Sequence, residues 1–473
     1  MKVRATVRLC LCVCAYAMST PEPPRSKRQR NDASPSPRAS EPGRDVDPSV
    51  VSVLMPCRNA QPWLSACVRS VLTQRDVALE LIVGDDGSTD GSREWLVALE
   101  RAMASRQVRL SRPRLDDGED GAKAFDEDTL TCENERMRSY TVEEVARDAE
   151  PRCSLRVLSI DRDEEESPSG QGLALNRCFR ASVGAYIGEM ESDDLRPPMA
   201  FAALKEALDA HDTWDAVTSK IELCGWERQG MRRFERFQNE LLEPSELASS
   251  RFIEIPALRA TALFRRSALV DLRKKTHANA LYRDIWPNPQ GVVVDYASLD
   301  AKAPVLDGLP HRWWPVDSDF WHRWFHHDFV VAKISRNLYI WRQYSAQSTR
   351  THNRCSLEQL RRCKAYFFVA AVLEGKFAPS ISEIRVYGVG ATLEAWKSAI
   401  QLEFAEQNGS DETRVFSLPH KPGASRWSSK DASDSVLHVF AYGMAPARAK
   451  VRRAISRCFR GDDLRSFIHV FVA

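Results

Sequence analysis

Three clusters of acidic residues in this chain have the types and surroundings that suit metal binding or proton transfer. They are Asp85-Asp86, Glu191-Ser192-Asp193-Asp194 and Asp317-Ser318-Asp319. Carboxylate oxygens are the ligands that Mg²⁺ and Mn²⁺ prefer, so Asp193 and Asp194 are candidate metal ligands. Asp317 and Asp319 lie among aromatic residues, and apolar surroundings raise the pKa of a carboxyl group and help it to accept a proton.

The first cluster follows a pattern that is typical of a βαβ unit. Residues 52–60 and 81–90 each begin as an apolar strand that breaks into a polar turn, and a helix-like stretch over 62–74 lies between them. In a parallel sheet, ligands bind at the carboxyl ends of the strands, where Asn59 and the Asp85-Asp86-Gly87-Ser88 turn fall. The pattern therefore predicts a parallel α/β sheet with a polar ligand at this edge.

The second cluster also follows a predicted strand directly. Apolar alternation predicts strands at 154–160 and 185–190, with a helix opened by Gly172 and continuing to residue 180 between them. The second of these strands ends on Glu191. The acidic run is therefore expected at the same edge of the sheet as the first cluster.

Length and composition divide the chain into two domains and a tail. Residues 1–47 are rich in Pro, Ser and Arg and predict a disordered tail. Residues 48–350 form the predicted main domain, interrupted at about 105–153 by a charged insertion, and 355–473 a smaller C-terminal α/β domain.

Charge, cysteines and hydropathy exclude some functional classes. The 67 basic and 65 acidic residues leave a net charge of +2, so no global field indicates a nucleic-acid or membrane partner. The 12 cysteines form no CxxC pairs and predict reduced thiols in a cytoplasmic protein. Residues 1–17 resemble a short secretory signal, which is the competing interpretation, and no apolar run approaches the ~20 residues of a membrane span.

Four motifs occur in an order that resembles the family 2 inverting glycosyltransferases. They are Val-Leu-Met-Pro-x-Arg-Asn-Ala at 53–60, Gly-Asp-Asp-Gly-Ser-Thr-Asp-Gly-Ser at 84–92, Gly-Leu-Ala-Leu-Asn-Arg at 172–177 and Glu-Ser-Asp-Asp at 191–194. The resemblance implies a GT-A-type nucleotide-sugar-binding domain with a mostly parallel sheet flanked by helices. It also implies a UDP-sugar donor, Mn²⁺ or Mg²⁺, and a single displacement with inversion at the anomeric carbon.

The same resemblance implies a role for each candidate residue. The donor-binding residues would be Pro56, Asn59, Asp85, Asp86, Ser88, Gly172, Asn176, Glu191 and Arg342. Asp193 and Asp194 would hold the metal. Asp317 would be the general base that deprotonates the acceptor, with Asp319 as the reserve candidate.

The chain departs from the family pattern at two positions, and two assignments have alternatives. Glu191 stands where Asp is usual and Val316 where Glu is usual, which puts the first metal ligand and the base motif in question. Asp86 could instead cap the helix that follows it. Arg350 is the alternative to Arg342 as the arginine that contacts the diphosphate, since a guanidinium matches phosphate oxygens.

Two further motifs are interpreted as structural. His322, His326 and His327 have a spacing that permits zinc, but no third ligand is evident and a partly buried helix face is expected. Gly388 and Gly390 follow a predicted strand and precede a helix, which indicates a tight turn and not a dinucleotide site.

Residues 236–242 and the positions that follow them resemble the β-1,3-N-acetylglucosaminyltransferase-like proteins, a group identified with queuosine-tRNA galactosyltransferase. This resemblance implies UDP-galactose as donor and the queuosine of a tRNA as acceptor. A basic stretch near the C-terminus could follow RNA phosphates or form a solvated helix face. Its members are Arg448, Lys450, Arg452, Arg453, Arg457 and Arg460.

Two alternatives to this function stay open. One is the transfer of GlcNAc from UDP-GlcNAc, or of another hexose, to a glycan or protein. The other is a non-catalytic nucleotide-sugar-binding or RNA-binding protein, which the departures at Glu191 and Val316 motivate.

Overall fold

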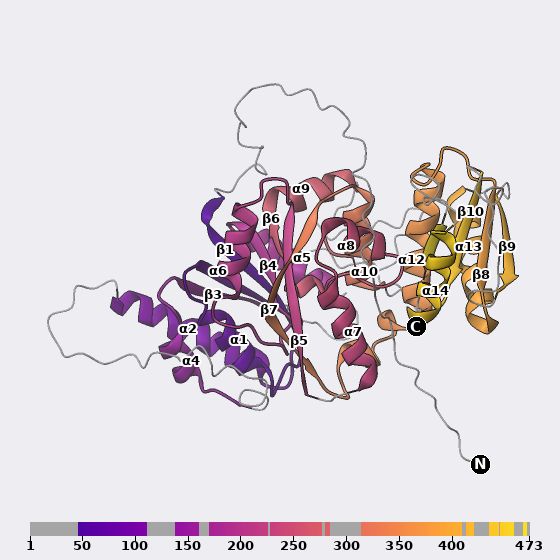
Figure 1. Cartoon of the computed structure of the whole chain (residues 1–473). Helices are drawn as coiled ribbons and strands as arrows, with labels where there is room; N and C mark the ends of the chain where they lie inside the picture. The colour runs from indigo at the N-terminus through magenta and orange to yellow at the C-terminus, as the bar shows by residue number, and fades with distance from the viewer. Residues whose placement is uncertain are drawn as a thin grey trace, which may run out of the picture.

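The computed structural model covers the strands and helices that carry the predicted site (Figure 1). The residues that it describes are 46–110, 138–159, 170–225, 228–276, 280–283, 314–408, 413–420, 435–443, 445–457 and 467–470. The predicted signal-like segment, nearly all of the predicted tail and most of the predicted charged insertion lie outside the described residues, as does Arg460.

Seven strands form the larger sheet, in the order β3-β2-β1-β4-β6-β5-β7. Their bounds are β1 (Asp47–Cys57), β2 (Ala78–Asp85), β3 (Cys153–Ser159), β4 (Gly184–Glu189), β5 (Ala216–Gly225), β6 (Leu263–Arg265) and β7 (Val331–Gln343). All neighbours pair in parallel except β6, which is antiparallel to both β4 and β5. The predicted mostly parallel sheet is confirmed.

Helices cover both faces of this sheet (Figure 1). Their bounds are α1 (Leu64–Leu72), α2 (Ser92–Leu110), α4 (Val142–Asp148), α5 (Gln171–Ala181), α6 (Ala200–Asp209), α7 (Gln229–Glu240), α8 (Pro244–Ser250), α9 (Arg266–Lys275) and α10 (Val316–His326). A single 3₁₀ turn, η2 (Arg259–Thr261), precedes β6.

The alternation of side chains along β1 explains why the sheet is covered on both sides. Val53 and Met55 belong to one buried cluster with α1, α2 and α6, whereas Leu54 belongs to a second cluster with α5, α9 and α10. Successive residues of a strand point to opposite faces, so a strand that is apolar at every position must be buried on both. This double burial leaves the carboxyl ends of the strands as the place where polar side chains gather.

A second, smaller sheet follows near the C-terminus, in the order β11-β10-β8-β9 with all pairs parallel. Its strands are β8 (Glu383–Gly388), β9 (Arg414–Pro419), β10 (Val436–Ala441) and β11 (Phe467–Val470). The helices after β7 are α11 (Ser348–Thr351), α12 (Leu357–Leu373), α13 (Gly390–Asn408) and α14 (Ala445–Ile455), with the 3₁₀ turn η4 (Asn353–Cys355). The smaller C-terminal α/β unit predicted from the sequence is therefore present.

The strand-to-helix turn predicted at Gly388 and Gly390 is also confirmed. β8 ends at Gly388 and α13 begins at Gly390. Gly390 has a φ of 60°, a conformation that glycine adopts without steric cost.

The larger and smaller parts pack against each other through α10 and α12. Trp314 and Phe252 share a buried cluster with Phe368 and Trp396 of the C-terminal part. His322 of α10 is buried between the rings of Phe252 and Phe367. The histidine face of α10 thus lies in a packed interface.

Cysteines and hydropathy can be checked over the described residues. Five cysteines are free and buried, and Cys355 is free and half-buried. Cys224 is instead disulfide-bonded, against the prediction of reduced thiols throughout. Among the helices that the structure describes, none has both the length and the apolar composition that a membrane crossing needs.

Candidate active site

The loops that follow β1 and β2 are joined by hydrogen bonds at the carboxyl edge of the sheet. The backbone N–H of Asn59 donates to Ser88 Oγ at 2.9 Å, and the N–H of Thr89 donates to Asn59 Oδ1 at 2.8 Å. Asn59 has a φ of 50°, which asparagine tolerates better than most residues. Asn59 and Ser88 therefore hold two predicted donor-binding loops together.

The two aspartates after β2 have different surroundings. Asp85 is fully buried, and both of its carboxylate oxygens lie 3.3 Å from the backbone N–H of Ser88, which donates to them. Asp86 is also buried, and its backbone N–H donates to the carbonyl of Cys57. At the start of α2, Asp90 Oδ1 accepts the N–H of Ser92. Asp90 thus binds the first backbone N–H of α2.

Two other predicted donor-binding residues, Pro56 and Gly172, lie close to the same edge. Pro56 is buried near the end of β1, opposite Gly84 of β2. Gly172 is buried in the first turn of α5, and its carbonyl accepts a hydrogen bond from Asn176 Nδ2 at 2.8 Å. Both residues are thus packed into the protein at the base of the site.

Asn176 holds a distant segment against α5. Its Nδ2 also donates to the carbonyl of Tyr282 at 2.8 Å, and its Oδ1 accepts the N–H groups of Leu281 and Tyr282, each at 3.0 Å. The side chain is only 4% exposed. Asn176 therefore positions the segment at 281–282 against α5, and its contact with a donor stays a prediction.

Asp193 and Asp194 lie together after β4, but only one has exposed surface. Asp194 is 1% exposed, and its two oxygens accept hydrogen bonds from the Tyr339 hydroxyl at 2.6 Å and the Arg342 backbone N–H at 2.8 Å. Asp193 is half-buried and accepts a hydrogen bond from the Tyr344 hydroxyl at 2.7 Å. Asp194 therefore fixes β7 beside this turn, and Asp193 is the better placed of the two to meet a ligand.

Glu191 interacts electrostatically with two other carboxyl groups, those of Asp193 and Asp317. Burial raises the pKa of Glu191 to about 8, and the negative charges of Asp317 and Asp193 add to the shift. Gln171 Nε2 donates to Glu191 Oε1 at 2.6 Å. Over the described residues no three His, Cys, Asp or Glu side chains form a metal-binding group. Mg²⁺ is commonly held by one or two carboxylates with substrate phosphates and water, and Asp193 suits that mode of binding.

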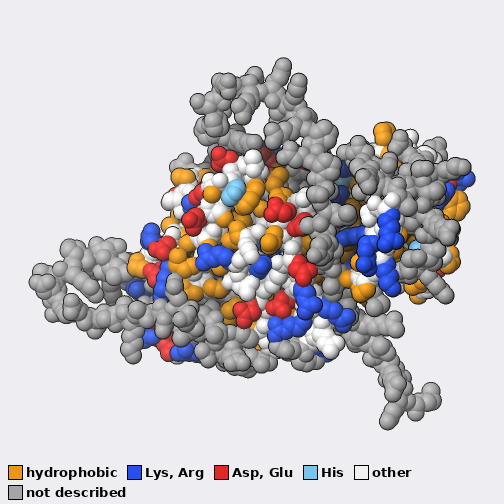
Figure 2. Space-filling view, viewed as in Figure 1, with side chains coloured by type: hydrophobic (Ala, Val, Ile, Leu, Met, Phe, Trp, Pro, Cys, Tyr) orange, Lys and Arg blue, Asp and Glu red, His pale blue; other side chains and the backbone are white. Residues whose placement is uncertain are grey.

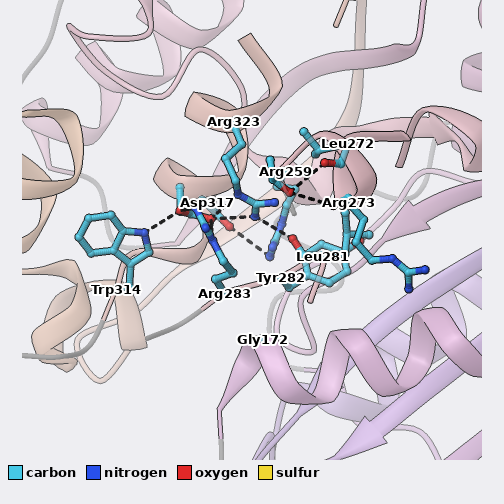
Figure 3. Close-up of polar contacts among 12 residues, drawn as sticks. Gly172, Arg259, Leu272, Arg273, Leu281, Tyr282, Arg283, Trp314, Asp317 and Arg323 are labelled. Atoms are coloured by element: carbon cyan, nitrogen blue, oxygen red, sulfur yellow. Dashed lines mark hydrogen bonds and ion pairs between the residues drawn. The ribbon is translucent and has the colours of Figure 1, made fainter. Parts of the chain in front are cut away.

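Asp317 is held at the start of α10 by a buried arginine. Nη2 of Arg259 lies 3.1 Å from Asp317 Oδ1 (Figure 3). Nε of the same side chain lies 2.8 Å from Glu189 Oε2. Arg259 is fully buried, whereas 35% of the Asp317 side chain is exposed. The Tyr282 ring lies 5.0 Å from the Arg259 guanidinium carbon. Arg259 thus ties the end of β4 to the first turn of α10 and leaves Asp317 open to solvent.

Asp319, two residues further on, is closed off from solvent. It is fully buried and pairs with Arg323 at 2.7 Å and with Arg283, while the Trp314 indole N–H donates to it at 2.8 Å. Figure 3 shows these arginines and Trp314 close together around α10. Burial alone would raise the pKa of Asp319, but the two arginines outweigh it and lower the pKa. These partners remove Asp319 as the reserve base, because no acceptor can reach it.

Arg342 is buried beside the turn that carries Asp193. Its Nη1 donates to the carbonyl of Asp193 at 2.9 Å, and its guanidinium carbon lies 5.3 Å from the Trp63 ring. The ring of Tyr344 stacks on the ring of Trp63, with the ring centroids 5.1 Å apart. The alternative arginine, Arg350, is half-buried and donates to Gln343 Oε1 at 2.5 Å. Arg342 is therefore the arginine that adjoins Asp193.

The sequence analysis missed Arg259, Glu189, Tyr282 and Tyr344. Glu189 could have been found, because it ends the strand that leads directly into Glu191. Arg259 lies in a 3₁₀ turn without a motif, and its importance comes only from contacts that sequence does not show.

One family model matches part of the chain. Residues 52–122 match the model described as Glycosyl transferase family 2, which covers β1, β2 and the predicted donor-binding loops between them. This part of the chain is therefore similar to glycosyltransferase family 2, which supports glycosyltransferase activity.

Solved glycosyltransferase structures are among those similar to the chain. S. aureus TarS 1–349 in complex with UDP-GlcNAc is 12% identical with a TM-score of 0.39, covering 76% of this chain and 74% of TarS 1–349. The mannosyltransferase PcManGT from Pyrobaculum calidifontis, in complex with GDP-Man and Mn²⁺, is 14% identical with a TM-score of 0.34. The match covers 77% of this chain and 74% of PcManGT. Glucosyl-3-phosphoglycerate synthase from Mycobacterium tuberculosis, in complex with Mg²⁺ and UDP, is 17% identical with a TM-score of 0.34. The match covers 71% of this chain and 82% of the synthase.

Proposed function

We propose that the protein transfers galactose from UDP-galactose to a hydroxyl of queuosine in tRNA, with inversion at the anomeric carbon. The observation that carries the transferase part is the carboxylate of Asp317, which is about one-third exposed, is held by buried Arg259 and interacts electrostatically with Glu191. A base next to a donor-binding edge is what a direct displacement requires. The family match over residues 52–122 supports the same reaction class.

The donor would bind along the carboxyl edge of β1, β2 and β4. Asp86 would accept from the N–H of the uracil base, with Pro56 and Asn59 shaping that pocket. Asp193 would hold Mn²⁺ or Mg²⁺ together with diphosphate oxygens, and the cation would offset the negative charge of the departing UDP. Arg342, whose guanidinium already contacts the Asp193 carbonyl, would face the diphosphate.

The transfer step would need no covalent enzyme intermediate. The acceptor oxygen attacks the anomeric carbon while the bond from that carbon to the UDP oxygen breaks, and Asp317 takes the proton of the acceptor hydroxyl. Arg259 orients Asp317 through Oδ1 and stays paired with Glu189, so its position does not depend on the substrate. Because Asp317 is about one-third exposed, the acceptor can approach it from solvent.

The choice of galactose and queuosine rests on the resemblance of residues 236–242 and their surroundings to the queuosine-tRNA galactosyltransferase group. A cytoplasmic location belongs to this choice, since the acceptor would be a cytoplasmic tRNA. Transfer from UDP-GlcNAc to a glycan or protein is the competing outcome.

The test is UDP release by the purified full-length chain with Mn²⁺, comparing UDP-galactose and UDP-GlcNAc with and without queuosine-containing tRNA. We expect release from UDP-galactose that depends on this tRNA and fails with tRNA that lacks queuosine. Release that is indifferent to tRNA, or restricted to UDP-GlcNAc, would overturn the acceptor assignment. UDP binding without release from either donor would favour a non-catalytic protein.

A further inference from the structure

Helix α7 presents a cluster of arginines that the proposed reaction does not use. Figure 2 shows Lys and Arg side chains gathered over this helix. A surface hollow here is lined by Arg228, Gln229, Arg232, Arg233 and Arg236. We call these four arginines the α7 arginine surface.

Helix geometry places these arginines on neighbouring turns. Residues three to five positions apart lie near one another on a helix, and the span from 228 to 236 covers about 12 Å. Phe234 and Phe237 of the same helix are buried against the protein. The arginines are therefore directed away from the core by the packing of the opposite face.

Part of the positive charge of this surface is paired with a carboxylate. Arg232 pairs with Glu235 at 3.0 Å, and Glu235 also accepts the N–H of Leu223. The residues that line the hollow, among those that the structure describes, include no carboxylate. Arginines that repel one another across a hollow favour an anionic ligand, because the ligand relieves that repulsion.

The α7 arginine surface adjoins the candidate active site. β5 leads into α7, and its last residues, Cys224 and Gly225, pair with Arg342 and Gln343 of β7. The ring of Phe234 in α7 lies 5.7 Å from the ring of Trp341. The buried face of α7 and the strand before it thus contact the end of β7.

A fifth arginine extends the surface toward the end of β7. Arg350 donates to Gln343 Oε1 at 2.5 Å. Burial lowers the pKa of Arg350, and the positive charge of nearby Arg228 lowers it further. Arg228 of the α7 arginine surface therefore interacts electrostatically with Arg350, which follows β7 in the chain.

We propose that the α7 arginine surface binds phosphate groups of an RNA acceptor and so holds the RNA beside Asp317. This inference rests on the proposed function, which names a tRNA as acceptor. The planar guanidinium matches phosphate oxygens, and over about 12 Å a nucleic-acid strand presents several phosphates. The substrate class that this surface selects is a polyanion with regularly spaced charges.

The basic stretch of α14 is the competing location for RNA, and the structure gives part of it another role. Arg448 is only 3% exposed and donates to the carbonyls of Tyr442 and Gly443. Its guanidinium therefore supports the loop before α14. Lys450 and Arg453 are exposed and provide a matched control of equal charge.

The experiment compares two double variants of the full chain. Arg233→Gln with Arg236→Gln removes two exposed charges from α7, and Lys450→Gln with Arg453→Gln removes two from α14. Binding of a fluorescently labelled RNA stem–loop is measured by anisotropy against salt concentration. Since each phosphate contact on a single strand contributes about 0.7 to the slope of log affinity against log salt, the α7 variant should lose about 1.4 of it. The α14 variant should keep the wild-type slope.

Equal losses in both variants, or no loss in the α7 variant, would overturn the proposal. Polyglutamate is added as a competitor, and displacement of the RNA by polyglutamate as efficient as that by unlabelled RNA would refute the selection of nucleic acid. UDP binding is measured in the same preparations. RNA binding that depends on α7 without UDP binding would sustain this inference and contradict the proposed function. Turnover that depends on queuosine-containing tRNA and is unchanged in the α7 variant would sustain the proposed function and overturn this inference.

Discussion

Asp317 and Asp319 stand two positions apart in the first turn of α10, yet their surroundings are opposite. Asp317 is about one-third exposed and shares one buried arginine with Glu189. Asp319 is fully buried and has two arginines and an indole N–H of its own. The difference shows that residue type and sequence position do not decide which carboxylate can react. The number of surrounding donors and the access of solvent decide it.

The contrast also separates two uses of buried arginine. Arg283 and Arg323 neutralise Asp319 and join the segment at 281–283 to α10. Arg259 neutralises Glu189 within the core and reaches Asp317 with its remaining nitrogen. The cluster around Asp319 therefore contributes stability. The cluster around Arg259 positions Asp317, the base that we propose.

The largest expected effect is on the rate of Asp317→Asn. Loss of a general base lowers a rate by about 100-fold to 10,000-fold. We expect that loss in kcat, with UDP binding unchanged and the free energy of unfolding altered by less than about 1 kcal/mol, because the pair with Arg259 is partly solvated. Steady-state kinetics, UDP titration and urea unfolding check the three quantities. Joint loss of turnover and UDP binding would contradict the role assigned to Asp317.

Asp319→Asn should lower the stability of the protein and leave its rate nearly unchanged. Removing one partner from a buried ion pair costs about 3–5 kcal/mol, because the remaining charges stay buried without compensation. Urea unfolding should therefore show a large loss of stability, and the rate per folded molecule should change little at low temperature. A loss of turnover in protein shown to be fully folded would make Asp319 a participant in the reaction after all.

Arg259→Lys should have a smaller effect on the rate. One ammonium cannot reach both Glu189 and Asp317 in the way that the guanidinium fork does. We expect kcat to fall roughly tenfold to a hundredfold from misplacement of the base, with UDP affinity retained. Arg323→Lys is the matched control and should leave kcat near the wild-type value in folded protein. Equal losses of kcat in both variants would mean that Arg259 acts only through stability.

The smallest expected effect is a change in how stability depends on pH. Burial raises the pKa of Glu189 from 4.5 to about 7, so its contribution to stability is complete below pH 4.5 and is lost as the pH rises through 7. The pKa of Asp319 is lowered, so its contribution is present above pH 3.8 and is lost at more acidic pH. In urea unfolding, Glu189→Gln should reduce the decline of the free energy of unfolding between pH 4.5 and 7. Asp319→Asn should reduce the loss of that free energy below pH 3.8. An unchanged slope in Glu189→Gln would refute the shift.

The sequence predicted those parts of the molecule that depend on local pattern. The apolar runs of β1 and β2 and the turns after them follow from strand periodicity and turn chemistry, so the parallel sheet and its polar edge could be predicted. The smaller C-terminal sheet followed from the same signals. The antiparallel strand β6, of three residues, was too short to leave a periodic signal.

The partners of each polar side chain could not be predicted, because they come from distant segments. Asn176 meets Tyr282, and Asp194 meets Tyr339 and Arg342, across more than one hundred residues of chain. A motif identifies such residues as important but does not distinguish a ligand contact from a structural one. Arg259 has no motif at all, and only its burial between two carboxylates reveals it.

Buried Asp319 also holds together two points of the chain, Arg283 and Trp314, that are far apart in the sequence. Arg283 and Trp314 both bind Asp319, so the residues on either side of 284–313 end close together. Two segments that are distant in the sequence are therefore joined at the first turn of α10, and this junction also sets where Asp317 stands relative to them.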